Sequence, residues 1–295
     1  MNHVFNIIGI IGYQYCIQKL SIYNILYNWL KRTGYTVILD LHIAKILHIK
    51  NVLSGNILEI GKISDLVIIV GGDGSILQAA KILSVYSVKI IGINMGNLGF
   101  LTDLEPNSAL KELKEILNGN FYVENRFLLD IHLLKNNIYV KKKTAINEIV
   151  IHSKKIAKMI KFDVYIDACF AFFQRSDGLI ISTPTGSTAY SLSAGGPILI
   201  PTLNAIMLIP MFSHALSSRT LIVSSDSIIQ LKFPNNTINV IVSCDGKTSF
   251  QISKKDKIFI QKSKVFMKLV HSNNYSYFHV LNKKLGWYRN FNKNY

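Results

Sequence analysis

We expect two domains of different class, an α/β domain with a parallel sheet followed by a β-rich domain. Three observations predict this architecture. The chain has 295 residues, of which 49% are apolar and 17% charged, enough for two hydrophobic cores. Strand-like and helix-like segments alternate in the first part of the chain, whereas β-branched or alternating segments dominate after Phe121.

The first domain is expected to alternate strands and helices. Residues 4–12 form an apolar strand, and residues 18–32 then place apolar side chains at helical spacing until Gly34 ends the helix. The other strands are expected at 35–39, 66–70 and 88–93, and the other helices at 75–83 and 108–117. This alternation is typical of a Rossmann-like parallel sheet whose strands are connected by helices.

The second domain is expected to be mostly β. Its strand-like segments are 127–133, 145–152, 160–166, 206–209, 228–233, 238–242 and 257–261. The pair Gly119-Asn120 marks the change of texture, so the domains are expected at 1–125 and 126–274. Residues 275–295, with a helix over 275–289, are expected to pack back on the first domain.

Several protein classes are excluded by composition and pattern. The mean hydropathy is positive, but no apolar run reaches the roughly 20 residues of a membrane-spanning helix. No basic residue precedes the apolar stretch 7–11, so a signal peptide is not expected and the protein is predicted to be cytoplasmic. The cysteines, Cys16, Cys169 and Cys244, form no CxxC pair, which argues against a disulfide framework or structural zinc.

The formal charge of +16 suggests polyanionic partners, but the charges are dispersed. The one triplet, Lys141-Lys142-Lys143, is typical of a solvated hairpin tip. A basic nucleic-acid-binding protein should group its lysines with aromatic residues. That class therefore stays an alternative, and no nucleic-acid or membrane partner is expected.

The strongest local motif is the turn Gly71-Gly72-Asp73-Gly74-Ser75, which follows a predicted strand and precedes a predicted helix. Glycines let the backbone approach a phosphate, and the helix N-terminus supplies free N–H groups. The turn is neither a Walker A loop nor a GxGxxG motif. An acid inside such a turn has little structural purpose, so Asp73 is a candidate proton acceptor. The alternative is an ordinary strand-to-helix turn in which Asp73 is the helix N-cap.

A second loop, residues 94–101, leaves the next strand at the same expected edge of the sheet, and together the two loops should form a crevice. The third motif is Arg175-Ser176-Asp177-Gly178 followed by the hydroxyl- and glycine-rich run 182–197, which offers hydrogen-bond donors to a base or a ribose. Asn147-Glu148, on an expected strand, could bind the two hydroxyls of a ribose or lie on an exposed strand face.

The segment Ser243-Cys244-Asp245-Gly246-Lys247 is expected to be a hairpin turn unless another strand end brings it to the site. No HExxH or GxSxG motif is present. His152, His214 and His271 are expected to be structural.

In this order and spacing, the motifs resemble the NAD kinase family, specifically its bacterial members. The resemblance covers nearly the whole chain, from the Gly71–Gly74 turn through Gly96-Asn97-Leu98-Gly99-Phe100-Leu101-Thr102-Asp103 to Leu285-Gly286-Trp287. It implies transfer of the γ-phosphoryl group of ATP to the 2′-hydroxyl of the adenosine ribose of NAD, giving NADP and ADP. It also implies an active site between the two domains, a divalent cation, expected to be Mg²⁺, and a homodimer or homotetramer.

The resemblance assigns Asp73 as the proton acceptor. It implies that the following residues bind the substrates: Gly71, Gly72, Gly74, Asn147, Glu148, Lys158, Arg175, Asp177, Thr188, Ala189, Tyr190, Ser191, Leu192, Ser193 and Lys247. Met95, Lys158 and Lys247 depart from the residues that relatives commonly carry. The glycine turn alone is shared with lipid and sugar kinases, which remain an alternative, although a lipid kinase should have an apolar cleft where this chain is rich in hydroxyls.

Overall fold

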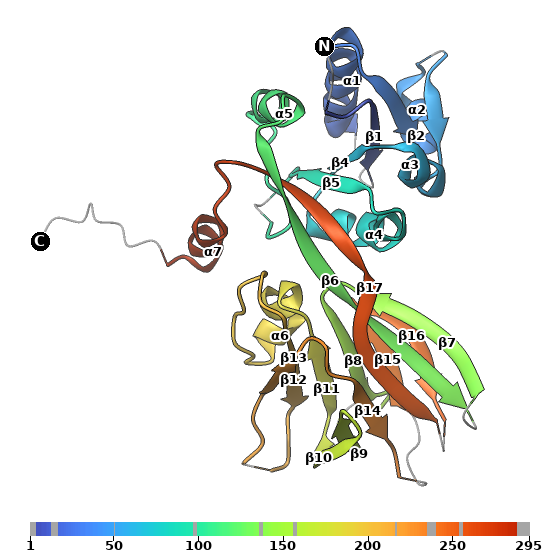
Figure 1. Ribbon diagram of the computed structural model, residues 1–295, viewed down its shortest axis with the longest axis vertical. Helices are drawn as coiled ribbons and strands as arrows, with labels where there is room; N and C mark the ends of the chain where they lie inside the picture. The colour runs from blue at the N-terminus through green and yellow to red at the C-terminus, as the bar shows by residue number, and fades with distance from the viewer. Residues whose placement is uncertain are drawn as a thin grey trace, which may run out of the picture. The chain divides into compact units, whose positions relative to one another are not determined.

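The computed structural model describes residues 4–12, 17–49, 51–96, 99–135, 138–155, 158–215, 217–234, 240–253 and 256–287. The chain divides into two compact units, which we call the α/β unit (Met1–Asn125 and Met267–Tyr295) and the β unit (Arg126–Phe266). Both unit boundaries fall inside long strands, β6 (Phe121–Lys135) and β17 (Lys257–Ser272) (Figure 1). In the described part of the chain, no helix has the length and apolar character needed to cross a bilayer.

The α/β unit is built on a parallel sheet with the strand order β17-β5-β4-β1-β2-β3. Its central strand β4 is fully buried, as expected for a strand covered by helices on both faces. The elements of this unit are β1 (Ile7–Gly12), α1 (Ile17–Arg32), β2 (Thr36–Asp40), α2 (Leu41–Leu47), β3 (Leu53–Gly55), α3 (Ile57–Ile63), β4 (Leu66–Val70), α4 (Asp73–Leu83), the 3₁₀ turn Ser84–Tyr86, β5 (Lys89–Ile93), α5 (Ala109–Leu117) and α7 (Tyr277–Leu285).

The order of these strands reverses between β1 and β4, because β2 and β3 lie on one side of β1 whereas β4 and β5 lie on the other. In open α/β sheets, ligands bind outside the carboxyl ends of the strands at such a point. The turn that contains Asp73 follows β4 directly. The fold therefore places this turn where a nucleotide is expected.

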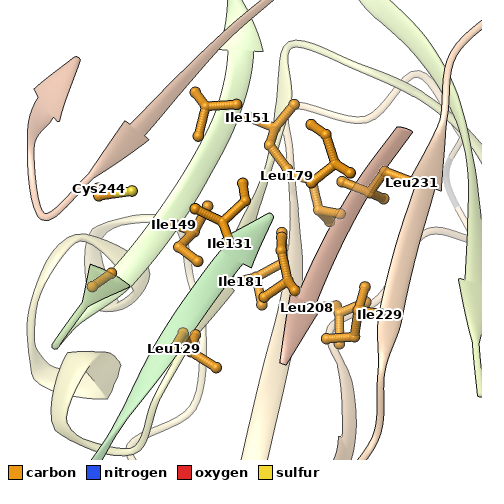
Figure 2. Packing of buried hydrophobic residues seen from close by; sticks show 14 of the residues in the cluster. Leu129, Ile131, Ile149, Ile151, Leu179, Ile181, Leu208, Ile229, Leu231 and Cys244 are labelled. Carbon is orange, nitrogen blue, oxygen red and sulfur yellow. The ribbon is translucent and has the colours of Figure 1, made fainter. Parts of the chain in front are cut away.

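The β unit contains a six-stranded antiparallel sheet with the order β13-β12-β11-β8-β15-β16. Across a hydrophobic core it faces a second sheet of this unit, with the order β10-β9-β14-β17 and with β6 paired to both β17 and β7. Figure 2 shows part of this core, with Leu129 and Ile131 of β6 and Leu231 of β14. The other elements are β7 (Ile138–Ala145), β8 (Glu148–Ser153), β9 (Ile160–Ile166), β10 (Cys169–Ser176), β11 (Gly178–Ser182), the 3₁₀ helix Thr185–Thr188, α6 (Tyr190–Ser193), β12 (Ala205–Met211), β13 (Leu221–Ser224), β14 (Ile229–Lys232), β15 (Val240–Cys244) and β16 (Lys247–Ile252).

Strand β8 shows how alternation separates the core from the opposite face of the sheet. The side chains of Ile149 and Ile151 lie in the sandwich core, together with Leu179 and Ile181 of the neighbouring β11 (Figure 2). Val150 packs in a separate cluster, with Ile180, on the other face. Glu148 and His152 share that other face by the same period of two.

Several expectations from the sequence need correction. Lys141–Lys143 lie on β7 and not at a hairpin tip. The strand expected over 145–152 is two strands, because β7 ends at Ala145 and β8 begins at Glu148. The segment 40–65 carries α2, β3 and α3, which the sequence analysis did not predict. A capping box was the missed signal for α3, since the Asn56 side chain accepts from Glu59 N–H while Glu59 Oε2 accepts from Asn56 N–H at 2.7 Å.

Some predictions fall on residues outside the described ranges. These are Cys16, Asn97 and Leu98, residues 238 and 239 of an expected strand, and the last residues of the expected C-terminal helix, of which 277–285 are α7. Within the described residues, Cys169 is exposed on β10 and Cys244 is buried at the end of β15.

Candidate active site

The glycine turn of the α/β unit holds Asp73 at the first position of helix α4. The N-cap residue of this helix is Gly72, and no side chain caps the helix. The alternative that Asp73 is the N-cap is therefore wrong. A Cβ added to Gly72 or to Gly74 would meet no heavy atom within 4 Å. These two backbone positions therefore face open space beside the N-terminus of a helix, as a phosphate-binding turn requires.

The carboxylate of Asp73 is fixed by the second glycine-bearing loop. Phe100 N–H donates to Oδ2 at 2.8 Å, and Leu101 N–H donates to Oδ1 at 3.0 Å. The two loops therefore meet at the edge of the sheet, as the sequence analysis predicts. Asp73 does have a structural purpose, contrary to our expectation, but an ionised carboxylate offers about four acceptor sites, so two N–H groups do not exhaust it.

Gly99 explains why this contact needs glycine. A Cβ at Gly99 would lie 1.9 Å from Asp73 Oδ1, so a side chain at this position would displace the carboxylate. The hydroxyl of Thr102 accepts a hydrogen bond from Gly99 N–H at 3.2 Å and closes the loop on itself. The glycines of the two loops are thus needed for different reasons. Gly72 and Gly74 leave open space beside the helix N-terminus, whereas Gly99 leaves room for the carboxylate of Asp73.

The β unit contains a cavity of about 480 Å³ on the outer face of the six-stranded sheet. It is lined by Glu148, Val150 and His152 of β8 and by Ser153, Lys155, Lys158, Asp177, Tyr190, Met211, Ser243 and Gly246. Glu148 is buried, and Tyr190 is exposed at the rim. Carboxylates, a phenol and two lysines around a cavity of this size suit a ligand with hydroxyls, a flat ring and phosphates.

The start of β8 is held from two sides. The carboxylate of Asp245 accepts from the backbone N–H groups of Ile146 (3.0 Å), Asn147 (2.7 Å) and Glu148 (3.2 Å). The Thr183 hydroxyl donates to the carbonyl of Ile146 at 2.7 Å. Because these groups take up the backbone of 146–147, the segment leaves the strand pattern just before Glu148, which is thereby positioned in the cavity.

The turn between β15 and β16 is the hairpin predicted from the sequence. Asp245 and Gly246 are its two central residues, with φ of 47° and 72°, as an Asp-Gly turn of this type requires. The turn also contributes Gly246 to the cavity. Asp245 is therefore both a turn residue and a support for the site, a second role that local sequence does not reveal.

The hydroxyl-rich loop is shaped mainly by its own side chains. Ser187 Oγ donates to the carbonyl of Leu199 and accepts from its N–H, while Ser191 Oγ donates to the carbonyl of Gly186 at 2.7 Å. A Cβ at Gly186 would lie 2.3 Å from the carbonyl oxygen of Asn147, so the loop and the start of β8 pack backbone to backbone. These buried bonds hold Tyr190 against the cavity.

Of the predicted binding residues, Glu148, Lys158, Asp177 and Tyr190 line the cavity together. Ser193 lines a smaller adjoining cavity of about 250 Å³ that shares Tyr190 and Met211. The others lie apart: Gly71, Gly72 and Gly74 in the turn of the α/β unit, Arg175 exposed on β10, Lys247 exposed at the start of β16, Asn147 just before β8, and Thr188, Ala189, Ser191 and Leu192 in the hydroxyl-rich loop.

Sequence reasoning missed four polar members of the cavity, His152, Ser153, Lys155 and Ser243. The ring of His152 lies between Ser153 O (3.0 Å from Nδ1) and Ser243 Oγ (3.2 Å from Nε2). In the neutral ring this arrangement places the proton on Nδ1 and lets Nε2 accept from the Ser243 hydroxyl. The signal that could have found His152 is its spacing of four residues from Glu148, which on a strand puts both on one face.

The fold and these two sites define a class, a nucleotide-dependent phosphotransferase. The α/β unit presents a glycine turn with a carboxylate at a helix N-terminus, which suits a phosphate, and the β unit presents a cavity whose lining suits a nucleoside. Family models agree: the ATP-NAD kinase N-terminal domain matches residues 8–121, and the ATP-NAD kinase C-terminal domain matches residues 146–272. The chain belongs to the ATP-NAD kinase family.

Relatives named NAD kinase match over nearly the full length. The NAD kinase of Wigglesworthia glossinidia brevipalpis is 61% identical over 99% of this chain and 99% of its own length. That of Yersinia pestis is 50% identical over 97% of this chain and 98% of its own.

Solved structures agree. Yeast NADH kinase in complex with NADH has a TM-score of 0.86 at 25% identity, covering 98% of this chain and 89% of that one. An NAD kinase from Archaeoglobus fulgidus in complex with ATP has a TM-score of 0.71 at 26% identity, covering 96% of this chain and 100% of that one.

The activity is that of an NAD kinase, an ATP-dependent phosphotransferase that uses ATP and NAD. The resemblance, the fold class and the activity predicted from the sequence are confirmed, and the lipid-kinase, sugar-kinase and nucleic-acid-binding alternatives are set aside.

Proposed function

We propose that the enzyme transfers the γ-phosphoryl group of ATP to the 2′-hydroxyl of the adenosine ribose of NAD, and that Asp73 accepts the proton of that hydroxyl. The bond from the 2′-oxygen to the γ-phosphorus forms as the bond from that phosphorus to the β,γ-bridging oxygen breaks, and the products are NADP and ADP. The carrying observation is that Asp73, held by two backbone N–H groups, lies between two glycines that face open space.

Phosphoryl transfer suits a rigidly held carboxylate. Most of the rate of such reactions comes from positioning and from electrostatic stabilisation of the transferring group. The bonds from Phe100 and Leu101 fix the orientation of Asp73 without a flexible side-chain partner. The N-terminus of α4 would stabilise the phosphate charge.

In the β unit, Glu148 and Asp177 are proposed to accept hydrogen bonds from the hydroxyls and amine of the adenosine, and Tyr190 to pack against a ring. Glu148 is supported by Asp245, and Asp177 by its own backbone N–H bond to the carbonyl of Met211 at 3.0 Å. Asn147, Lys158, Arg175, Lys247 and residues 188–193 remain proposed contacts of the dinucleotide.

A divalent cation, proposed to be Mg²⁺, fits the donors of the α/β unit. No group of three or more His, Cys, Asp or Glu side chains that could hold a metal occurs among the described residues. Mg²⁺ does not need one, because it is commonly bound by substrate phosphates, water and one or two carboxylates. Asp73 is the carboxylate that would hold it, and the ion would neutralise charge on the triphosphate.

We also propose that the enzyme is a homo-oligomer, a dimer or tetramer, and that it is located in the cytoplasm.

The test is an assay of the purified chain with ATP, NAD and Mg²⁺, in which the position of the new phosphate is determined by ³¹P NMR or enzymatically. We expect 2′-phosphorylated dinucleotide and equimolar ADP, and loss of both with EDTA. A product phosphorylated at another hydroxyl would refute the proposed acceptor, and full activity in EDTA would refute the cation. Gel filtration with light scattering tests the oligomer.

A further inference from the structure

A buried histidine of the α/β unit lies between two carboxylates. His271, near the end of β17, is 1% exposed. Its Nδ1 is hydrogen-bonded to Asp103 Oδ2, and its Nε2 lies 2.9 Å from Glu124 Oε2. An ionised carboxylate can only accept, so both ring nitrogens must carry protons to make these two bonds. The geometry therefore describes an imidazolium that bridges two carboxylates.

The surroundings of His271 favour this charge state. Burial lowers the pKa of His271, but the hydrogen bonds and negative charges of Asp103 and Glu124 outweigh it, so the pKa is raised above its ordinary value. Two phenols also lie against the ring: Tyr275 stacks on it with ring centroids 4.0 Å apart, and the ring of Tyr122 lies at 5.3 Å. Truncation of one member of such a buried ionic cluster leaves the others uncompensated.

The cluster is connected to Asp73 by a short segment of backbone. Asp103 follows Thr102, whose hydroxyl binds Gly99 N–H, and the same loop carries the Phe100 and Leu101 N–H groups that hold the Asp73 carboxylate. The loop is also fixed to β5, since Leu104 N–H donates to the carbonyl of Gly92 at 3.2 Å and its own carbonyl accepts from Asn94 N–H at 2.8 Å. His271 therefore anchors the loop from β17, while Glu124 anchors the histidine from β6.

We propose that His271 is a positioning residue for the phosphoryl transfer: bridging Asp103 and Glu124, it fixes the loop 99–103 that orients the Asp73 carboxylate. The inference rests on the proposed role of Asp73. The histidine touches no substrate in this scheme, and its effect reaches the reaction only through the two backbone N–H groups. It assigns a function to a residue that the sequence analysis regarded as structural.

Two variants test this role. His271→Gln keeps a polar side chain but can donate to only one carboxylate at a time, and Asp103→Asn keeps the size of the residue and removes its charge. For each we expect kcat to fall about 10-fold or more, in the range of a misplaced catalytic group, with the KM for NAD unchanged. The matched control is His132→Gln, which changes a histidine on β6 in the β unit that is hydrogen-bonded to Tyr139.

A merely structural role is distinguished by two further measurements. The amides of Phe100 and Leu101 should exchange with solvent faster in His271→Gln than in the wild type, relative to the core strand β4. The decline of kcat at alkaline pH that results from loss of the imidazolium proton should be absent in His271→Gln and present in His132→Gln. Unchanged exchange of these amides, or an unchanged alkaline decline, would overturn the proposal.

The inference and the proposed function can fail separately. In an Asp73→Asn background, His271→Gln should cause no further loss, because the residue it positions is already changed. If Asp73→Asn has normal turnover, the proposed function fails. If Asp73→Asn is impaired but His271→Gln and Asp103→Asn keep normal kcat, only the inference fails. Should His271→Gln not fold, Asp103→Asn carries the kcat and amide-exchange measurements, and its alkaline decline should move to lower pH, because a carboxylate that raises the pKa of His271 has lost its charge.

Discussion

The turn around Asp73 and the cavity around Glu148 are built in different ways. The turn uses backbone: glycines that leave space, N–H groups of a helix N-terminus, and one carboxylate held by two further N–H groups. The cavity uses side chains that neighbouring strands and distant loops bring to one face of a sheet. A site built from backbone is therefore disrupted by any added Cβ. A site built from side chains is instead disrupted by changes in the residues that hold those side chains in place.

The largest expected effect distinguishes a catalytic role of Asp73 from a purely structural one. Asp73→Asn should lower kcat by roughly a hundredfold or more, the range typical of losing a general base, while the affinity for NAD, measured by calorimetry, is kept. Asp65→Asn is the control, because Asp65 also accepts two backbone N–H bonds in this unit, from Asn6 (2.7 Å) and Ile7 (2.9 Å). It should lower the melting temperature and leave kcat alone. Equal turnover of the two variants would remove Asp73 from the mechanism.

The next effect concerns the support of the cavity. Asn is well tolerated in the left-handed conformation of residue 245, so Asp245→Asn should keep the hairpin turn but weaken the bonds to the N–H groups of 146–148. Loss of one charge-assisted bond corresponds to about a tenfold rise in Kd for NAD, with kcat changed less. Asp226→Asn, at an exposed ion pair with Lys262, should leave the Kd unaltered. An unaltered Kd in Asp245→Asn as well would show that Asp245 serves the turn alone.

A pair of glycine substitutions compares the two regions directly. Gly186→Ala should destabilise the protein by about 1–3 kcal/mol, because its Cβ would meet the carbonyl oxygen of Asn147 at 2.3 Å. Gly74→Ala should instead raise stability by about 0.4–1 kcal/mol, since the position is helical and open. The same open position is where a phosphate is proposed to approach, so Gly74→Ala should raise the KM for ATP. Urea unfolding measures the change in stability of each variant, and steady-state kinetics measure the KM for ATP. An unchanged KM for ATP in Gly74→Ala would contradict the proposed approach of a phosphate to this position.

The smallest effect is on the pH dependence of stability. The pKa of His271 is raised in the folded protein, so its contribution is complete below the unfolded value of about 6.5 and is lost as the pH rises through the higher folded value. The free energy of unfolding, measured by urea titration at a series of pH values, should fall over this interval in the wild type. The fall should be smaller in His271→Gln, and an equally steep fall would contradict a bridging imidazolium.

How far the sequence could be interpreted depended on whether a signal was local. The strand Leu66–Val70 and the turn after it were predicted to the residue, because a buried apolar run and a glycine cluster are contiguous. The segment 40–65 was missed although its capping box is also local. The lysine triplet was misplaced because a basic run is equally compatible with an exposed edge strand, which is where β7 puts it.

The residues that line the cavity were harder to assign from the sequence, and the reason is physical. Glu148, Asp177 and Tyr190 were named from motifs, but nothing in their own segments shows that they share a cavity with His152 and Ser243. Ser243 lies opposite Val150 in the sheet, and this register is a property of strand pairing. Support by Asp245 and by His271 was missed for the same reason, since each acts on residues far away in the chain.

The sequence by itself determined the two-part architecture, the glycine turn around Asp73 and the family, because periodicity, glycine spacing and contiguous motifs are encoded along the chain. Only the tertiary structure decided which side chains meet: Asp73 with the amides of Phe100 and Leu101, Asp245 with the start of β8, and His271 with two carboxylates. These contacts join residues that are distant in sequence, and their formation depends on the packing of whole strands and loops, which no single segment specifies.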